Sequence, residues 1–226
     1  MTGLQNLTEL EVKVKKPLKD GIMGTWSEMR HLSLWYNNSD KEDLLPEDMQ
    51  NMKKLQSFML HLYGGLISLL NCKFEHLESV YLFRCEEITA LSPLEQLPNL
   101  KLLKLGWCDN LRELGIGSPS GYVSLQKLVL KRLNRLESLG GASWQRGVWD
   151  ERTLPQLRVL KMVNCPSLKR FPRGMEKLPN LCALIYQPWN PWNHKSAMEW
   201  WESIMWEDEN MKVKLQQIFM PRGPKY

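Results

Sequence analysis

The chain has 226 residues, a formal net charge of +5 at pH 7 and 43% hydrophobic residues. A charge this modest is insufficient by itself to indicate nucleic-acid binding. No apolar run approaches the roughly 18 residues that a membrane-spanning helix needs. The amino-terminal segment also lacks the apolar core of a secretory signal, so we expect a cytoplasmic protein.

One pattern of four apolar residues recurs along the chain, with gaps of three, three and two residues between its members. Its second member steps from Leu7 to Met29, a gap of 22 residues, and the longest such step, from Leu125 to Leu157, is 32. This is the period of leucine-rich repeats. The eight copies are Leu4, Leu7, Leu10, Val12; Trp26, Met29, Leu32, Leu34; Met52, Leu55, Phe58, Leu60; Phe74, Leu77, Val80, Leu82; Leu97, Leu100, Leu103, Leu105; Tyr122, Leu125, Leu128, Leu130; Leu154, Leu157, Leu160, Met162; and Leu178, Leu181, Leu184, Tyr186.

The last two residues of each copy lie two apart, so both point to one face of a short β-strand. Stacked coils would pair these strands in a parallel sheet over a continuous apolar ladder. The spacing therefore predicts an α/β leucine-rich-repeat solenoid, or horseshoe. Its parallel sheet would form the concave face, and irregular or short helical segments the convex side. We expect about eight repeats over residues 1–187 and a helical cap over residues 188–226.

Further apolar residues continue the pattern beyond several strands, where they would line the return side of each coil. They are Cys85, Ile88, Leu91; Cys108, Leu111, Leu114; Leu133, Leu136, Leu139; and Cys165, Leu168, Phe171. The three cysteines share one repeat position, at which a polar atom usually bonds the backbone of the turn. With Cys72 and Cys182 they make an odd set of five. We expect reduced structural thiols, with disulfides as the alternative.

Two segments depart from the repeat. The longest interval contains Trp144 and Trp149, which we expect to pack back onto the neighbouring coil, a functional loop being the alternative. After Tyr186, prolines end the strand series, and residues 196–199 fit a capping box that opens a helix. Its apolar stripe would be Trp200 or Trp201 with Ile204 and Met205, and a second helix would run from Met211 through Leu215, Ile218 and Phe219.

Two features of the chain, the style of its repeats and its C-terminal segment, resemble a known family. Residues 97–100 leading to 108–114, and 154–157 leading to 165–172, show the irregular cadence of intracellular leucine-rich repeats. Residues 199–209 are similar to a Trp-Trp-x-x-Leu-x-Trp-x-Asp/Glu ending. In both features the chain resembles the C-terminal leucine-rich-repeat domain of plant nucleotide-binding immune receptors of the coiled-coil class. The resemblance implies sensing of a pathogen effector or a modified host protein, and restraint of the resting receptor.

The nucleotide switch of that family needs a Gly-x-x-x-x-Gly-Lys-Ser/Thr loop, which this sequence lacks, so we expect no cofactor in this chain. The chain also opens inside a repeat. We therefore expect a truncated receptor, a partial gene model or a freestanding repeat protein. The alternative function is a freestanding leucine-rich-repeat adaptor or scaffold that binds a protein partner outside any receptor.

Side chains between the ladder residues should project from the concave face. Trp35, His61 and Phe83 share one repeat position, so they should form a column. Aromatic residues beside arginine and lysine are typical of protein-interface anchors. The predicted partner-binding residues are Trp35, Tyr36, Met59, His61, Tyr81, Phe83, Arg84, Lys104, Trp107, Lys127, Lys131, Arg132 and Lys161.

The expected partner is a protein: an effector, a host protein or the receptor's own nucleotide-binding domain. The basic residues among these candidates suit an acidic protein surface and also suit nucleic acid, although no nucleic-acid-binding motif accompanies them. None of the four histidines lies at metal-ligand spacing with a cysteine, and the chain has no nucleophile elbow. We therefore expect neither an enzyme nor a metal site.

Overall fold

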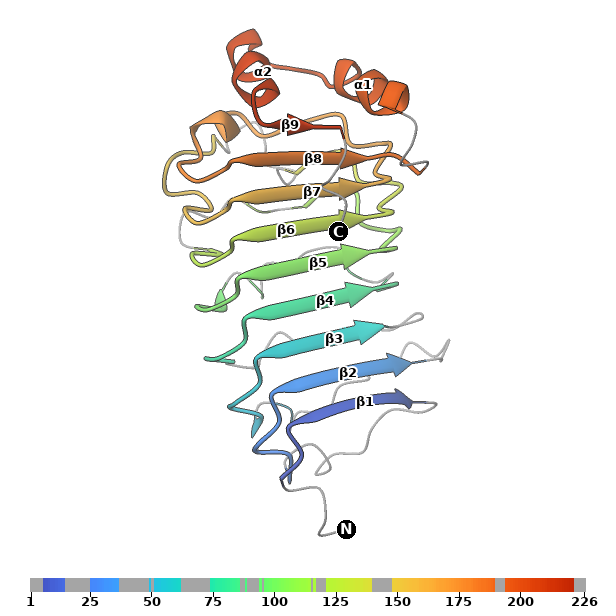
Figure 1. The fold of residues 1–226 in the computed structure, drawn as a ribbon, viewed down its shortest axis with the longest axis vertical. Helices are drawn as coiled ribbons and strands as arrows, with labels where there is room; N and C mark the ends of the chain where they lie inside the picture. Colours follow the sequence, from blue (N-terminus) through green and yellow to red (C-terminus); the bar gives the residue numbers. More distant parts are fainter. Residues whose placement is uncertain are drawn as a thin grey trace.

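The computed structural model describes residues 6–14, 25–36, 49, 51–61, 74–85, 88, 94, 96–114, 116, 121–139, 148–189 and 194–221. Their strands form one nine-stranded parallel sheet in sequence order, which Figure 1 shows as a stack of strands from β1 to β9. The strands are β1 (Glu9–Val14), β2 (His31–Tyr36), β3 (Ser57–His61), β4 (Ser79–Phe83), β5 (Leu102–Gly106), β6 (Lys127–Lys131), β7 (Val159–Val163), β8 (Ala183–Gln187) and β9 (Phe219–Met220).

Each strand pairs with the next in the register that the repeat predicts. Leu32 pairs with Phe58, for example, and Leu34 pairs with Leu60. Because every copy contributes apolar residues at the same two strand positions, the paired residues form two continuous rows beneath the sheet. Burying a leucine side chain fully contributes roughly 1.5–3 kcal/mol, so these rows are the main source of cohesion between coils. The predicted leucine-rich-repeat solenoid is confirmed.

The ladder is buried in every described coil except the first. Leu34, Leu105 and Leu130 have no exposed surface, whereas Leu10 and Val12 of β1 are only partly buried. Within the described residues no coil packs beyond β1, so its ladder has a neighbour on one side only. The residues predicted for the return side are also buried wherever they are described, and Leu4 and Leu91 lie outside the described residues.

Cysteines occupy one position just after three strands. Cys85, Cys108 and Cys165 are buried, and none of them forms a disulfide. The thiol of Cys85 donates to the carbonyl of Phe83 at 3.4 Å, and that of Cys108 donates to Gly106 at 3.5 Å. Burial raises the pKa of Cys165 to about 11, so this thiol keeps its proton. These thiols bond the backbone where each strand ends, and no disulfide joins any described cysteine; Cys72 lies outside that set.

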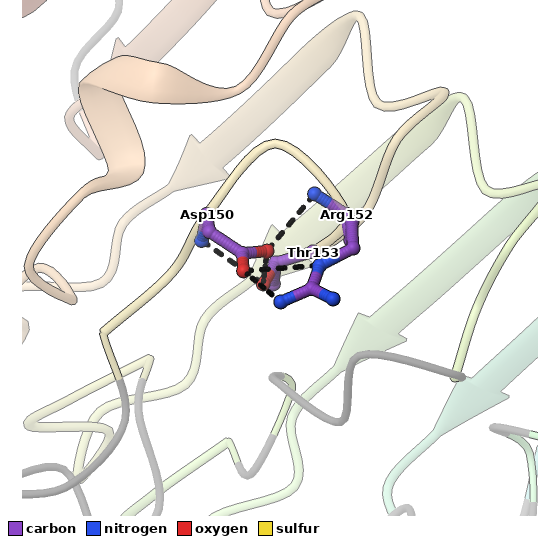
Figure 2. Close-up of polar contacts among 3 residues, drawn as sticks. All are labelled: Asp150, Arg152 and Thr153. Atoms are coloured by element: carbon purple, nitrogen blue, oxygen red, sulfur yellow. Dashed lines mark hydrogen bonds and ion pairs between the residues drawn. The ribbon is translucent and has the colours of Figure 1, made fainter.

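The long interval before β7 ends in a locally bonded turn. Trp149 is 2% exposed, as predicted, and its backbone N–H donates to the carbonyl of Arg173 at 2.7 Å. In the turn that follows, the carboxylate of Asp150 accepts hydrogen bonds from the backbone N–H and guanidinium of Arg152 and from the Thr153 hydroxyl (Figure 2). The hydrogen bonds from Arg152 hold the pKa of Asp150 below its usual value. Trp144 lies outside the described residues.

Two helices follow β8 at the end of the solenoid, α1 (His194–Glu202) and α2 (Glu209–Gln216) (Figure 1). Buried aromatic rings join α1 to the last coils. Trp200 stacks on Tyr186 of β8 with ring centres 3.8 Å apart, and its indole N–H donates to the carbonyl of Leu168 at 3.1 Å. Trp201 stacks on Phe219 at 4.2 Å. The tryptophan pair of the ending thus packs one ring against the solenoid and one against β9.

Three details of the tail differ from the sequence prediction. Helix α1 begins two residues before Ser196, which therefore lies inside the helix and does not cap it. Ile204 and Met205 both lie past the end of the helix at Glu202; Ile204 is still buried, whereas Met205 is 52% exposed. Phe219 belongs to β9, which pairs with β8, and not to the second helix. That second helix starts after Asp208, whose carboxylate accepts from the N–H of Asn210 at 2.8 Å.

Candidate functional site

We call the exposed side of the sheet, opposite the buried ladder, the outer face; it is the surface that the sequence predicts to be concave. It carries the side chains that alternate with ladder residues along each strand. Trp35 pairs with His61, and His61 with Phe83, as predicted. Met59 and Tyr81 pair in the adjacent position, where Lys104 follows. The column predicted for Trp35, His61 and Phe83 is therefore present on the outer face, and a second column of Met59, Tyr81 and Lys104 lies beside it.

Aromatic rings contact one another along this face over four coils. Ring centres are 4.5 Å apart between Trp35 and His61, and 6.3 Å apart between His61 and Phe83. Phe83 then meets Trp107 edge to face at 5.8 Å. We call these four residues the aromatic row. Aromatic pairs at such distances add about 0.5–1.5 kcal/mol each beyond the area they bury, so the row is ordered before any partner binds.

Trp107 joins the row although it lies one residue past its strand. The residue at this position has a left-handed backbone in four successive coils, with φ of 54° at Arg84, 55° at Trp107, 53° at Arg132 and 52° at Asn164. In each case its N–H donates to the carbonyl that ends the next strand, as from Trp107 to Lys131 at 3.0 Å. This repeated hydrogen bond offsets the cost of a conformation that non-glycine residues rarely adopt.

Cations cover the end of the row. The ammonium of Lys131 lies 4.7 Å from the ring centre of Trp107, and the guanidinium of Arg132 lies 5.2 Å from it. The same guanidinium lies 3.7 Å from the ring centre of Trp189, which is 66% exposed. The sequence prediction omitted Trp189 because it follows Pro188 beyond the last predicted strand. An aromatic residue directly after the final repeat was the available signal.

Tyr36 does not belong to this surface. The sequence placed it among the exposed candidates because it follows Trp35. The structure extends β2 through Tyr36, which pairs with Val14 and is 3% exposed. Alternation along the longer strand turns its ring toward the ladder. Tyr36 is a core residue, and the other twelve candidates are all at least partly exposed.

Four lysines surround Val129, at the middle of β6. Lys127 and Lys131 precede and follow it by two positions on the same strand. Lys104 of β5 and Lys161 of β7 are its partners in the sheet register. We call these four residues the lysine cross. The register distributes these four predicted basic residues over three strand positions, and Arg132 lies beyond the end of β6.

Burial and mutual repulsion both act on this cluster. The pKa of Lys104 is lowered chiefly by burial and then by the charges of Lys131, Lys161 and Lys127. The pKa of Lys161 is lowered by burial and by Lys127 and Lys131. In the aromatic row, burial and then the charge of Arg84 lower the pKa of His61. A lowered pKa favours the neutral imidazole, so His61 joins the row mainly as an uncharged ring at neutral pH.

Within the described part of the chain, no group of three or more histidine, cysteine or acidic residues is placed to hold a metal ion. No helix of these same segments has the length and apolar composition required to cross a membrane. What the arrangement offers chemically is a binding surface of aromatic rings and ammonium groups.

Stacked coils, each giving one parallel strand over a buried apolar ladder, define a leucine-rich-repeat solenoid. Its sequence relatives are plant disease resistance proteins. The chain is 25% identical over 229 residues to Disease resistance protein At4g27190 of Arabidopsis thaliana, covering 97% of this chain. It is 32% identical over 107 residues to the probable disease resistance protein RF45 of the same plant, covering 47% of this chain. The predicted resemblance to plant immune receptors is confirmed.

The chain spans 20% of the length of the first of these relatives and 10% of the second. No protein-family model matches it. Among solved structures it is similar to an internalin from Listeria monocytogenes, with 13% identity, a TM-score of 0.30 and coverage of 98% of this chain and 88% of that one. A TM-score this low carries no argument, and the fold assignment depends on the sheet register and the buried ladder.

Proposed function

We propose that this solenoid is the protein-recognition module of a plant innate-immune receptor that acts in the cytoplasm. Its outer face binds a pathogen effector or a modified host protein. In the resting receptor the same face contacts another domain of the receptor and contributes to autoinhibition. Residues 1–187 form the recognition solenoid in this proposal, and residues 188–226 cap it. Nucleotide-driven switching lies outside this chain, which lacks the phosphate-binding loop.

The aromatic row is the observation that carries this proposal. Its four rings are partly exposed on the outer face, although the fold buries large apolar residues elsewhere, such as Phe58 and Trp201. Rings already held by their neighbours lose little conformational freedom when a partner covers them. Aromatic residues beside arginine are also the groups that dominate binding energy in protein interfaces. The similarity to disease resistance proteins favours an immune receptor as the context.

Exchange of partners on one surface requires that the incoming ligand bind the active receptor more tightly than the resting one. A ligand with equal affinity for both states would shift nothing. The row supports such competition, because its four partly exposed rings form one continuous surface that both the resting contact and the ligand would use.

Site-specific photo-cross-linking in plant tissue tests the proposal. A photoreactive residue replaces Met59 or Tyr81, which lie beside the aromatic row on the outer face. In matched controls it replaces Lys53 or Lys177, which are exposed outside the outer face. We expect the same protein adducts from both outer-face positions and neither control. Adducts that are equally abundant at the controls, or absent from the outer face, would contradict the proposed function.

A further inference from the structure

The lysine cross concentrates four cations around one apolar residue. Neighbouring strands lie about 4.8 Å apart, and residues two apart on a strand lie roughly 6.6 Å apart. Val129 is only 7% exposed although it belongs to the outer face. The aliphatic stems of the surrounding lysines are the groups placed to cover it, because long basic side chains lie along apolar surfaces. The ammonium of Lys104 lies 5.4 Å from the ring centre of Phe83, and that of Lys131 lies 4.7 Å from the ring centre of Trp107. The positive charge of the cross therefore extends along the outer face beside the aromatic row.

This charge is not neutralised within the described residues. Two ion pairs between successive coils lie just before the strands, from Lys54 to Glu28 at 2.7 Å and from Lys101 to Glu78 at 2.8 Å. None of the ion pairs in the described segments includes a lysine of the cross. The flanking outer-face positions carry apolar side chains, Leu102, Val159 and Val163, each partly exposed.

We infer that the lysine cross binds an acidic segment of a protein partner. Carboxylates of that segment pair with the four ammonium groups, and its apolar side chains cover the flanking Leu102, Val159 and Val163. The inference rests on the proposed recognition function and specifies the chemistry of what is recognised. Lowered pKa values at Lys104 and Lys161 show that repulsion already acts within the cross, and a bound carboxylate would relieve it.

Nucleic acid fits this surface less well. Single-stranded binding needs ring faces on which bases stack. The ring of Trp107 is instead covered by Lys131 and Arg132, at 4.7 Å and 5.2 Å. Arginine binds phosphate with two parallel hydrogen bonds, which lysine cannot do. The guanidinium of Arg132, however, already lies on the ring of Trp189. The partly exposed apolar neighbours of the cross offer nothing to a phosphodiester backbone but suit alternating acidic and apolar residues.

Selection from a library of short random peptides displayed on phage tests this inference. Three full-length proteins are used: the wild type, the Lys104→Gln/Lys161→Gln variant, and a Lys53→Gln/Lys177→Gln control with the same change in net charge. We expect aspartate and glutamate to be enriched in peptides selected by the wild type and the control, and not by the cross variant. Thermal unfolding checks that the variants fold.

One selected acidic peptide is then titrated against all three proteins. Removing two lysines should weaken its binding by roughly 2- to 30-fold, and the control should bind it as the wild type does. Equal affinity in the cross variant, or a wild-type selection without acidic enrichment, would overturn the inference. Oligothymidylate that binds the wild type and displaces the peptide would overturn it in favour of nucleic acid.

These outcomes are separable from failure of the proposed function. If the selected peptides lack acidic residues, the inference of an acidic segment is wrong, but the proposed recognition of a protein partner still stands. Photo-cross-linking at Met59 and Tyr81 does not depend on the charge of the partner. It therefore tests the proposed recognition function independently of the acidic segment.

Discussion

The ring of Phe83 occupies the space that a side chain at Gly106 would fill. A Cβ atom at Gly106 would lie 2.6 Å from Cδ1 and 2.9 Å from Cε1 of that ring. The two residues are partners in the sheet register. Because position 106 has no side chain, the ring extends across β5 toward Trp107, 5.8 Å away. Gly106 is thus a structural member of the aromatic row, although it contributes no side chain.

Gly106→Ala should therefore disturb the row. The ring of Phe83 must shift to avoid the new methyl group, and overpacking of this kind costs about 1–3 kcal/mol. Urea denaturation followed by far-ultraviolet circular dichroism measures the loss.

The control is the same substitution in a Phe83→Ala background, where the methyl group has room. Gly106→Ala should cost less there, with a coupling energy of about 0.5–3 kcal/mol between the two sites. Strictly additive effects would mean that the ring and the glycine do not compete for one space.

Trp200 should be much more sensitive to substitution than the exposed Trp189. Trp200→Ala removes the stack on Tyr186 and the hydrogen bond to Leu168, and we expect a loss of about 3–5 kcal/mol. Trp189→Ala is the matched control, because Trp189 is 66% exposed and should cost less than about 1 kcal/mol. Denaturant titration of both variants checks the order, and equal losses would contradict the packing described for the end of the solenoid.

The burial of Tyr186 should make the free energy of unfolding depend on pH in the alkaline range. Burial, and then the charge of Cys165, raise its pKa from 10.0 to about 12. The folded state therefore holds this proton more tightly than the unfolded state. The resulting stabilisation is fully present below about pH 10 and is lost as pH rises toward about 12.

The measurement is the free energy of unfolding of the wild type and of Tyr186→Phe across this range. The variant lacks the titrating hydroxyl, so its stability should fall less steeply. Parallel curves would show that Tyr186 is not shielded from solvent.

Lys104→Met should stabilise the protein slightly at neutral pH, because it keeps the apolar stem and removes a repelled charge. The pKa of Lys104 is lowered by burial and by its lysine neighbours, so the folded state disfavours the charged form. That penalty is present at neutral pH and disappears as pH approaches the ordinary value of 10.5.

A gain in Tm on the order of 1 °C is expected at low salt, and added salt should reduce it by screening the repulsion. Lys53→Met, at an exposed turn, should leave Tm unchanged. A loss of Tm in the Lys104 variant would contradict the repulsion within the cross.

The sheet was predictable from sequence because every copy places apolar residues at the same two strand positions, and a slip of one residue would turn them to the exposed face. Leu32, Phe58 and Val80 occupy one repeat position in sequence and pair in space. The same logic placed Trp35 beside His61 on the outer face.

Strand length and local backbone conformation were not predictable in this way. Nothing in the spacing shows that β2 continues through Tyr36, which decides whether that ring lies in the core. The left-handed residue that follows β4, β5, β6 and β7 also has no marker in residue type, because it is arginine at position 84 and tryptophan at position 107. The lysine cross emerged only from the register, because its members fall in three repeat positions.

The most direct test of the central claim is a binding titration with a partner captured at Tyr81. The Arg84→Glu/Lys131→Glu variant is compared with a Lys53→Glu/Lys177→Glu control that has the same change in net charge. We expect that only the Arg84/Lys131 variant loses affinity, while circular dichroism and Tm show that both variants are folded. Unchanged affinity in the folded Arg84/Lys131 variant would contradict recognition on the outer face.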